Sequence, residues 1–162
     1  MRSKSLRFST LSSEQVRDVS VLRVRKSSDL SHPAMGCTRG RCATCGEFPD
    51  GCPGHFGHIE LPIPVMHPMH VMACNTIALQ MCAVCAKRVS RGSECCGTRT
   101  RSSPSHELFC RADVSEWSDI TTSLQNMWIV NLPVPPVRIR QCSNDHEAPL
   151  TSLLHRVLRA CV

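Results

Sequence analysis

The sequence predicts a small, irregular α+β fold, in which short helices and strands surround two metal-stabilised cysteine clusters. The chain has 162 residues, which suits one domain or one segment of a larger protein. Aromatic residues make up only 4% of it, so a large aromatic core is not expected. Its 12 cysteines include two C-x-x-C pairs, a spacing that lets both sulfurs face one zinc ion. Bound zinc would therefore supply part of the stability that the core lacks.

The cysteines could instead form disulfide bonds, and this alternative needs an export signal. The start of the chain, MRSKSLRFSTLSSEQVRDVS, carries charged and hydroxyl residues and no apolar segment. The C-x-x-C pairs with nearby histidines are typical of metal sites in a reducing, intracellular compartment. The most apolar stretch, residues 63–86, includes two histidines, two amides and three cysteines, so no membrane span is expected.

The first part of the chain predicts short elements. Residues 1–10 are expected to be a basic tail, and a helix is expected to follow, because Ser12 can cap it. The β-branched content of residues 19–24 predicts a strand, and residues 26–36 read as a polar loop. Prolines keep residues 61–68 extended.

The second part of the chain also predicts short helices and a strand. Helices are expected over 69–81 and 115–126, and a strand over 127–132 that runs into a proline-rich extended segment. Apolar residues at helical spacing from Leu150 to Cys161 predict an amphipathic helix. The expected division of the chain is an N-terminal segment (1–36), a zinc-binding region (37–110) and a C-terminal segment (111–162).

The stretch CATCGEFPDGCPGHFGHIEL, residues 42–61, holds the first predicted metal site. Cys42 and Cys45 form one knuckle, and Cys52 and His55 form a second with the same two-residue gap. Three thiolates and one histidine make a closed set of the kind that structural zinc prefers. His58 is a rival fourth ligand at a looser spacing.

Cys82 and Cys85 open the second predicted site. Cys95 and Cys96 are the preferred partners, although side chains of adjacent residues tend to diverge, and Cys110 is held in reserve. The expected cofactor is therefore Zn²⁺ at two sites.

Charge and motifs narrow the function further. The net charge of +6 is weakly consistent with nucleic-acid contact, and thiolate-bound zinc would lower it to roughly +3. No dinucleotide-binding motif, P-loop or G-x-S-x-G motif occurs, so no catalytic residue and no small-molecule substrate is expected. The candidate nucleic-acid-facing residues are Arg99, Arg101, Arg111, Arg138 and Arg140.

The pattern C-x-x-C-x₆-C-P-G-H-F-G-H-I-E-L resembles the first zinc motif of the largest subunit of multisubunit DNA-dependent RNA polymerases, of the eukaryotic, archaeal and large-DNA-virus type. Three further stretches resemble that family in the same order. They are LSSEQVRDVSV at 11–21, PVMH at 64–67 and LPVPPVR at 132–138.

This resemblance implies a segment of the clamp, the mobile module that closes over DNA in the polymerase cleft. It implies ligands at Cys42, Cys45, Cys52 and His55, and a second site at Cys82 and Cys85 with two later cysteines, of which Cys96 best matches the last. It also implies other polymerase subunits and template DNA as partners, in a nucleus or at a viral site of transcription.

The sequence departs from the family in three places. Only nine residues separate Cys85 from Cys95, where the family has a long insertion. His32-Pro-Ala-Met-Gly36 stands where the family has Asp-Pro-Arg-Leu-Gly. The magnesium-binding aspartate loop, the bridge helix and the trigger loop are absent from the sequence. The chain is therefore expected to be a fragment, a split-gene product or a degenerate copy, part of a nucleotidyltransferase without being catalytic by itself.

Two other functions remain open on the sequence. A stand-alone zinc module could bind nucleic acid or protein through its basic loops. A RING-type ubiquitin ligase also uses two zinc ions, but the six residues between Cys45 and Cys52 are too few for its first loop.

Overall fold

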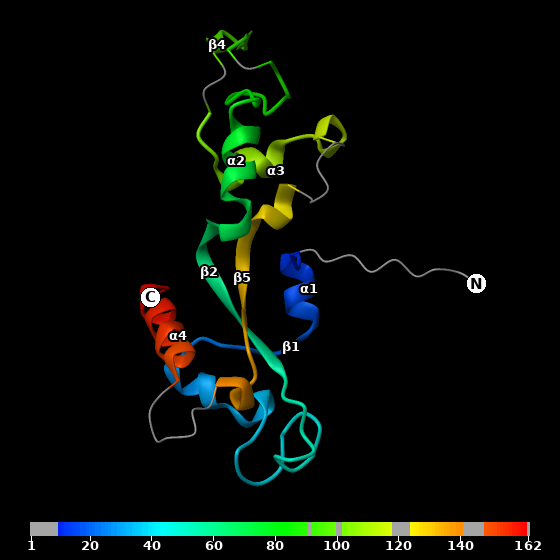
Figure 1. Ribbon diagram of the computed structural model, residues 1–162, viewed down its shortest axis with the longest axis vertical. Helices are drawn as coiled ribbons and strands as arrows, with labels where there is room; N and C mark the ends of the chain where they lie inside the picture. Colours follow the sequence, from blue (N-terminus) through cyan, green and yellow to red (C-terminus); the bar gives the residue numbers. More distant parts are fainter. Residues whose placement is uncertain (1–9, 91, 100–101, 118–123, 141–147, 162) are drawn as a thin grey trace, which may run out of the picture. The chain divides into compact units, whose positions relative to one another are not determined.

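The structure is a computed structural model that describes residues 10–90, 92–99, 102–117, 124–140 and 148–161 (Figure 1). Short helices and a three-stranded sheet confirm the predicted α+β class. Nearly all of the predicted basic tail lies outside the described residues.

The chain forms two compact units, and neither is a single run of sequence. Unit 1 comprises Met1–Ser12 and Pro64–Ile129, and unit 2 comprises Ser13–Ile63 and Val130–Val162. Strands β2 (Phe56–Met66) and β5 (Trp128–Val134) both continue from one unit into the other. The division expected from the sequence, into residues 1–36, 37–110 and 111–162, follows the order of the chain and stays a prediction.

Unit 2 begins with helix α1 (Ser13–Asp18) and strand β1 (Ser20–Arg23). β1 pairs in parallel with β2, and β5 lies on the other side of β2. The 3₁₀ helices η1 (Ser27–Ser31), η2 (Pro33–Met35) and η6 (Val137–Arg140) and helix α4 (Pro149–Ala160) complete the unit. Its buried core contains Val24, Leu30, Met35, Ile59, Val134, Leu154 and Leu158.

A glycine in β2 lets the loop before the first metal site pack on the sheet. A Cβ atom at Gly57 would lie 2.5 Å from Sδ of Met35 and 3.2 Å from the side chain of Val24. Any larger residue would push η2 away from the strand. The segment predicted as a polar loop, residues 26–36, contains the two 3₁₀ helices η1 and η2. Their apolar residues Leu30 and Met35 are buried.

The prolines of β2 lie on one edge of that strand. The carbonyl of His58 accepts from the N–H of Val24, so even-numbered residues of β2 turn their backbone groups towards the β1 edge. Pro62 and Pro64 are even-numbered, and among the described residues no strand pairs with this edge after His58. Because proline has no N–H, this edge lacks donors at those positions, while the odd-numbered residues face β5.

Unit 1 contains η3 (Pro68–His70), α2 (Val71–Ala78), the short strands β3 (Glu94–Cys95) and β4 (Thr98–Arg99), α3 (His106–Arg111), η4 (Val114–Trp117) and η5 (Leu124–Met127). Its core is built from residues of α2, α3, η4 and η5, the first residue of β5 and the segments next to α2 and α3. The buried residues are Cys74, Ile77, Ala78, Met81, Ala86, Leu108, Phe109, Ala112, Trp117, Leu124, Met127 and Trp128.

Three predicted elements differ from the structure. The helix expected over 69–81 is shorter, because Nδ1 of His67 caps a 3₁₀ turn that occupies residues 68–70. Over 115–126 the described residues form no α-helix but parts of η4 and η5, and residues 118–123 lie outside the description. Helix α3 was not predicted, although Ser105 caps it by accepting from the N–H of Leu108.

Candidate metal centres

The first cysteine group lies in unit 2 and consists of Cys42, Cys45, Cys52 and His55. One ligand atom from each residue lies within 4.8 Å of the others. Sγ of Cys52 is 3.6 Å from Sγ of Cys45 and 3.7 Å from Nε2 of His55. A tetrahedral zinc ion requires about 3.8 Å between two sulfurs and about 3.5 Å between a sulfur and a nitrogen. The donor set and its spacing therefore fit zinc.

Backbone hydrogen bonds shape the Cys42–Cys45 knuckle. The N–H of Gly46 donates to the carbonyl of Cys42 over 2.8 Å, and the N–H of Cys42 donates to the carbonyl of Glu47 over 2.8 Å. Gly46 has a φ of 74°, which favours glycine. Burial would raise the pKa of Cys42, but the N–H groups of Cys45 and Thr44 and the neighbouring thiols lower that pKa to about 6. The knuckle thus presents a thiolate near neutral pH.

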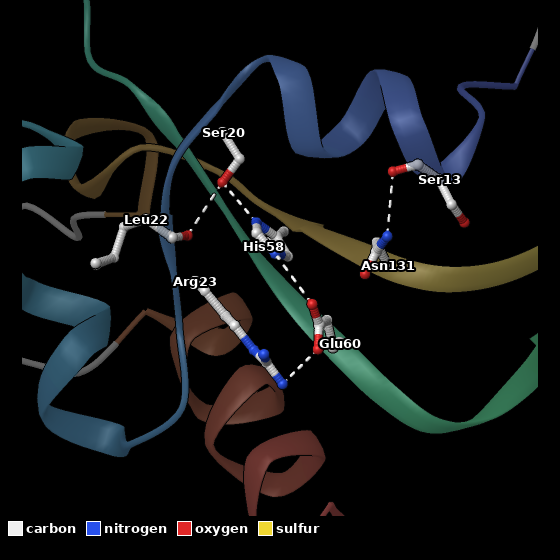
Figure 2. A network of polar contacts seen from close by, with 7 residues as sticks. All are labelled: Ser13, Ser20, Leu22, Arg23, His58, Glu60 and Asn131. Carbon is white, nitrogen blue, oxygen red and sulfur yellow. Dashed lines mark hydrogen bonds and ion pairs between the residues drawn. The ribbon is translucent and has the colours of Figure 1, made fainter.

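His58 lies outside this group and belongs to a polar network between β1 and β2 (Figure 2). Its Nδ1 is 2.8 Å from Oγ of Ser20, and that hydroxyl donates to the carbonyl of Leu22 over 3.0 Å. Since the hydroxyl hydrogen is used, Nδ1 of His58 must be the donor to Ser20. Nε2 lies 4.0 Å from Glu60, which also pairs with Arg23. Burial lowers the pKa of His58, although Glu60 acts against this.

The second cysteine group lies in unit 1 and consists of Cys82, Cys85, Cys95 and Cys96. Their sulfurs also lie within 4.8 Å of one another, with 3.7 Å between Cys85 and Cys95 and 3.9 Å between Cys95 and Cys96. The N–H groups of Cys85 and Val84 lower the pKa of Cys82 to about 6. The Cys95 thiol keeps its proton by donating to the sulfurs of Cys85 and Cys82, which raises the pKa of Cys95 to about 12. The spacing again fits a tetrahedral ion.

The two knuckles have the same backbone pattern. In the second, the N–H of Ala86 donates to the carbonyl of Cys82 over 2.9 Å, and the N–H of Cys82 donates to the carbonyl of Lys87 over 3.0 Å. Ala86 has a φ of 59°, at the position that Gly46 occupies in the first. The two cysteine groups therefore begin on equivalent turns.

A tight hairpin brings the adjacent cysteines Cys95 and Cys96 into one group. Cys95 pairs with Thr98 across β3 and β4, so Cys96 and Gly97 are the two turn residues. Their φ values of 52° and 71° are those of a type I′ turn, which needs positive φ at both central residues. This turn places both sulfurs beside Cys85, and nine residues are enough to close the group.

Cys110 lies apart from the second group. It sits on α3, where its sulfur is 3.5 Å from Nε2 of His106, one helical turn before it. Among the described residues, the group of four that could hold a metal ion includes Cys95 and not Cys110, which was the alternative.

The predicted nucleic-acid-facing arginines have different surroundings. Arg101 and the side chain of Arg99 lie outside the description. Arg111 is exposed and donates to the carbonyl of Val84, inside the second knuckle. Arg138 is exposed and donates to the carbonyl of Pro49 over 3.1 Å. Arg140 is only 5% exposed, and its guanidinium donates to the carbonyls of Leu30 and Pro135.

Several known proteins are similar to this chain in sequence. DNA-directed RNA polymerase subunit Rpo1N of Thermoplasma acidophilum is 34% identical over 99 residues, which cover 53% of this chain. A probable DNA-directed RNA polymerase II subunit RPB1 homolog of Invertebrate iridescent virus 6 is 33% identical over 91 residues, and DNA-directed RNA polymerase I subunit rpa1 of Schizosaccharomyces pombe is 32% identical over 95 residues, each covering 51% of the chain. About half of this chain is thus similar in sequence to subunits of DNA-directed RNA polymerases.

These similarities support the interpretation that the chain corresponds to an N-terminal segment of the largest subunit. They confirm the resemblance found in the sequence. The aligned part spans 11%, 9% and 6% of the length of these three relatives. No family model matches the chain. Within the described residues, no helix has the length and apolar character needed to cross a bilayer.

Proposed function

We propose that this chain is a structural, zinc-binding clamp segment of a DNA-directed RNA polymerase largest subunit that contributes to DNA engagement during transcription. The observation that carries this proposal is the pair of closed four-ligand groups in a homologue of those subunits. Four protein ligands leave no coordination position for water, so such a metal ion stabilises structure and performs no hydrolysis.

Zinc supplies folding free energy here, on the order of 10 kcal/mol per site in small zinc peptides. Cys42, Cys45, Cys52 and His55 would hold one ion. Cys82, Cys85, Cys95 and Cys96 would hold the other. Because the groups lie in different units, each unit would have a metal ion of its own.

The proposed partners are other RNA polymerase subunits and template DNA, in a nucleus or at a viral site of transcription. The names of the archaeal, viral and yeast relatives support this. Arg99, Arg101, Arg111 and Arg138 are the proposed DNA contacts, and of these Arg111 and Arg138 are exposed although each donates to one or more backbone carbonyls. Arg140 is a weaker candidate, since it is buried and donates to the carbonyls of Leu30 and Pro135.

Affinity purification of the tagged chain from its source organism tests the assembly. We expect a large particle that contains other polymerase subunits, and two zinc ions per chain by elemental analysis. Replacing Cys52 by serine should reduce the zinc content to one ion per chain. A free monomer that still holds two zinc ions would refute the assembly and leave the metal sites standing.

A second candidate function is a stand-alone zinc module that binds nucleic acid. It is favoured by the completeness of both ligand groups within this chain and by the net charge of +6. The isolated chain would then bind DNA with an affinity that falls steeply with salt, because phosphate contacts release counterions. An affinity that is unchanged from low to high salt would exclude this function.

A further inference from the structure

A distant segment of unit 2 lies directly against the first metal group. Residues 135–140 follow strand β5, and the side chain of Pro136 is fully buried. A Cβ atom at Gly54 would lie 2.5 Å from Cβ of Pro136 and 3.0 Å from its Cγ. The proline ring therefore rests on the glycine that separates the ligands Cys52 and His55.

Arg138 holds the same turn from the same segment. Its Nη1 donates to the carbonyl of Pro49 over 3.1 Å and to the carbonyl of Cys52 over 3.5 Å. The first carbonyl lies before the Cys52–His55 turn, and the second belongs to the ligand itself. The guanidinium of Arg138 thus links the carbonyl of Pro49 to that of Cys52, at the two ends of the segment that leads into the Cys52–His55 half.

At the Cys52–His55 half, the backbone hydrogen bonds of the described residues run to residues outside the turn rather than across it. The N–H of Cys52, for example, donates to the carbonyl of Phe48 over 2.9 Å. The N–H of Gly54 approaches Sγ of Cys52 at 3.4 Å, and the N–H of His55 donates to the carbonyl of Met35 over 3.2 Å. The Cys42–Cys45 half is instead closed by two backbone hydrogen bonds of 2.8 Å. The half that lacks its own closing bonds is the one that Pro136 and Arg138 cover.

We propose that Pro136 and Arg138 are positioning residues for the first metal site, and that they hold the Cys52–His55 half in its ligating conformation. This inference rests on the proposed zinc binding. It assigns a role to the Pro-Pro-Val-Arg stretch, residues 135–138, that is separate from nucleic-acid contact. A site with this half released loses two of its four ligands together, so the predicted effect is on the rate of zinc release.

Zinc release to a chromogenic chelator tests the proposal in the full chain. The Cys85→Ser background confines zinc to the first site. Arg138→Gln should release zinc about fivefold faster than Arg138, the effect of one lost hydrogen bond, with unchanged zinc content. Arg138→Lys should fall between the two, because lysine keeps the positive charge but its shorter side chain ends before the position of Nη1, the nitrogen that reaches both carbonyls.

Arg39→Gln is the matched control. Arg39 is exposed in the loop before Cys42, and the described residues offer it no hydrogen-bond or ion-pair partner, so its substitution removes the same charge alone. The charge-transfer absorption of Co²⁺ bound in place of zinc should show the same number of thiolate ligands in every variant. Equal release rates for Arg138→Gln and the parent, or equal acceleration by Arg39→Gln, would overturn the proposal. A Cys85→Ser chain that binds no metal at all would refute both the zinc site and the role of these residues.

Discussion

Replacing Gly54 by alanine tests how closely the Pro136 ring approaches the first metal group. Gly54 has a φ of 82°, so an alanine there costs roughly 1–2 kcal/mol in backbone strain. The new Cβ atom would also overlap Pro136 at 2.5 Å, and overpacking of this kind costs about 1–3 kcal/mol. Lower entropy of the unfolded chain offsets up to about 1 kcal/mol. The free energy of unfolding should fall by roughly 1–5 kcal/mol, a large part of the stability of a small domain.

Gly46→Ala provides the comparison for this measurement. Gly46 has a φ of 74°, but no atom lies within 4 Å of the position where its Cβ would be. It therefore carries the same strain without the overlap. Urea unfolding of the zinc-loaded chain should show the larger loss for Gly54→Ala, and adding Pro136→Gly should recover part of it. Equal losses for the two alanine variants would refute the close packing of Pro136 on the metal group.

Three further predictions follow from the same structure. Cys95→Ser should remove one zinc ion per chain, whereas Cys110→Ser should leave the content at two; loss of zinc from the Cys110 variant alone would reverse the ligand assignment. Arg140→Ala should lower the free energy of unfolding by about 1–3 kcal/mol, because buried carbonyls such as that of Leu30 lose their donor, and a thermal unfolding curve like that of the parent would contradict this. Without zinc, Cys42 and Cys82 have pKa values of about 6 against an ordinary 9.0. Because the fold depresses both values, their contribution to stability is complete above pH 9.0 and is lost as the pH falls to about 6, so the metal-free chain should unfold at lower urea concentration at pH 6 than at pH 9.0. A urea midpoint that does not change with pH would be incompatible with that sign.

The two clusters of cysteine and histidine side chains could be predicted from the sequence because they depend on local spacing. Two residues between Cys42 and Cys45, and between Cys52 and His55, are enough to define turns that aim side chains at one point. Local sequence patterns likewise predicted strand β1, which precedes the first site, and the amphipathic helix α4. These features depend on few residues and little on distant contacts.

Other features depend on conformations that the residue types do not reveal. The clustering of Cys95 with Cys82, Cys85 and Cys96 depends on positive φ angles at Cys96 and Gly97, and cysteine rarely adopts such an angle. A short helix such as α3 carries too little periodicity to be recognised, and only its Ser105 cap gave a signal. Likewise, no sequence pattern separates Arg140, which donates to buried carbonyls, from an arginine that faces solvent.

The prolines of β2 have a consequence for the chain as a separate molecule. An uncovered strand edge with regularly spaced N–H groups recruits further strands and leads to aggregation. Pro62 and Pro64 remove those donors from the edge that β1 leaves unpaired, beside the exposed apolar residues Ile63 and Val65. A segment of a large polymerase subunit could therefore be synthesised and handled alone without stacking into fibrils, and threonine at both positions would remove that protection.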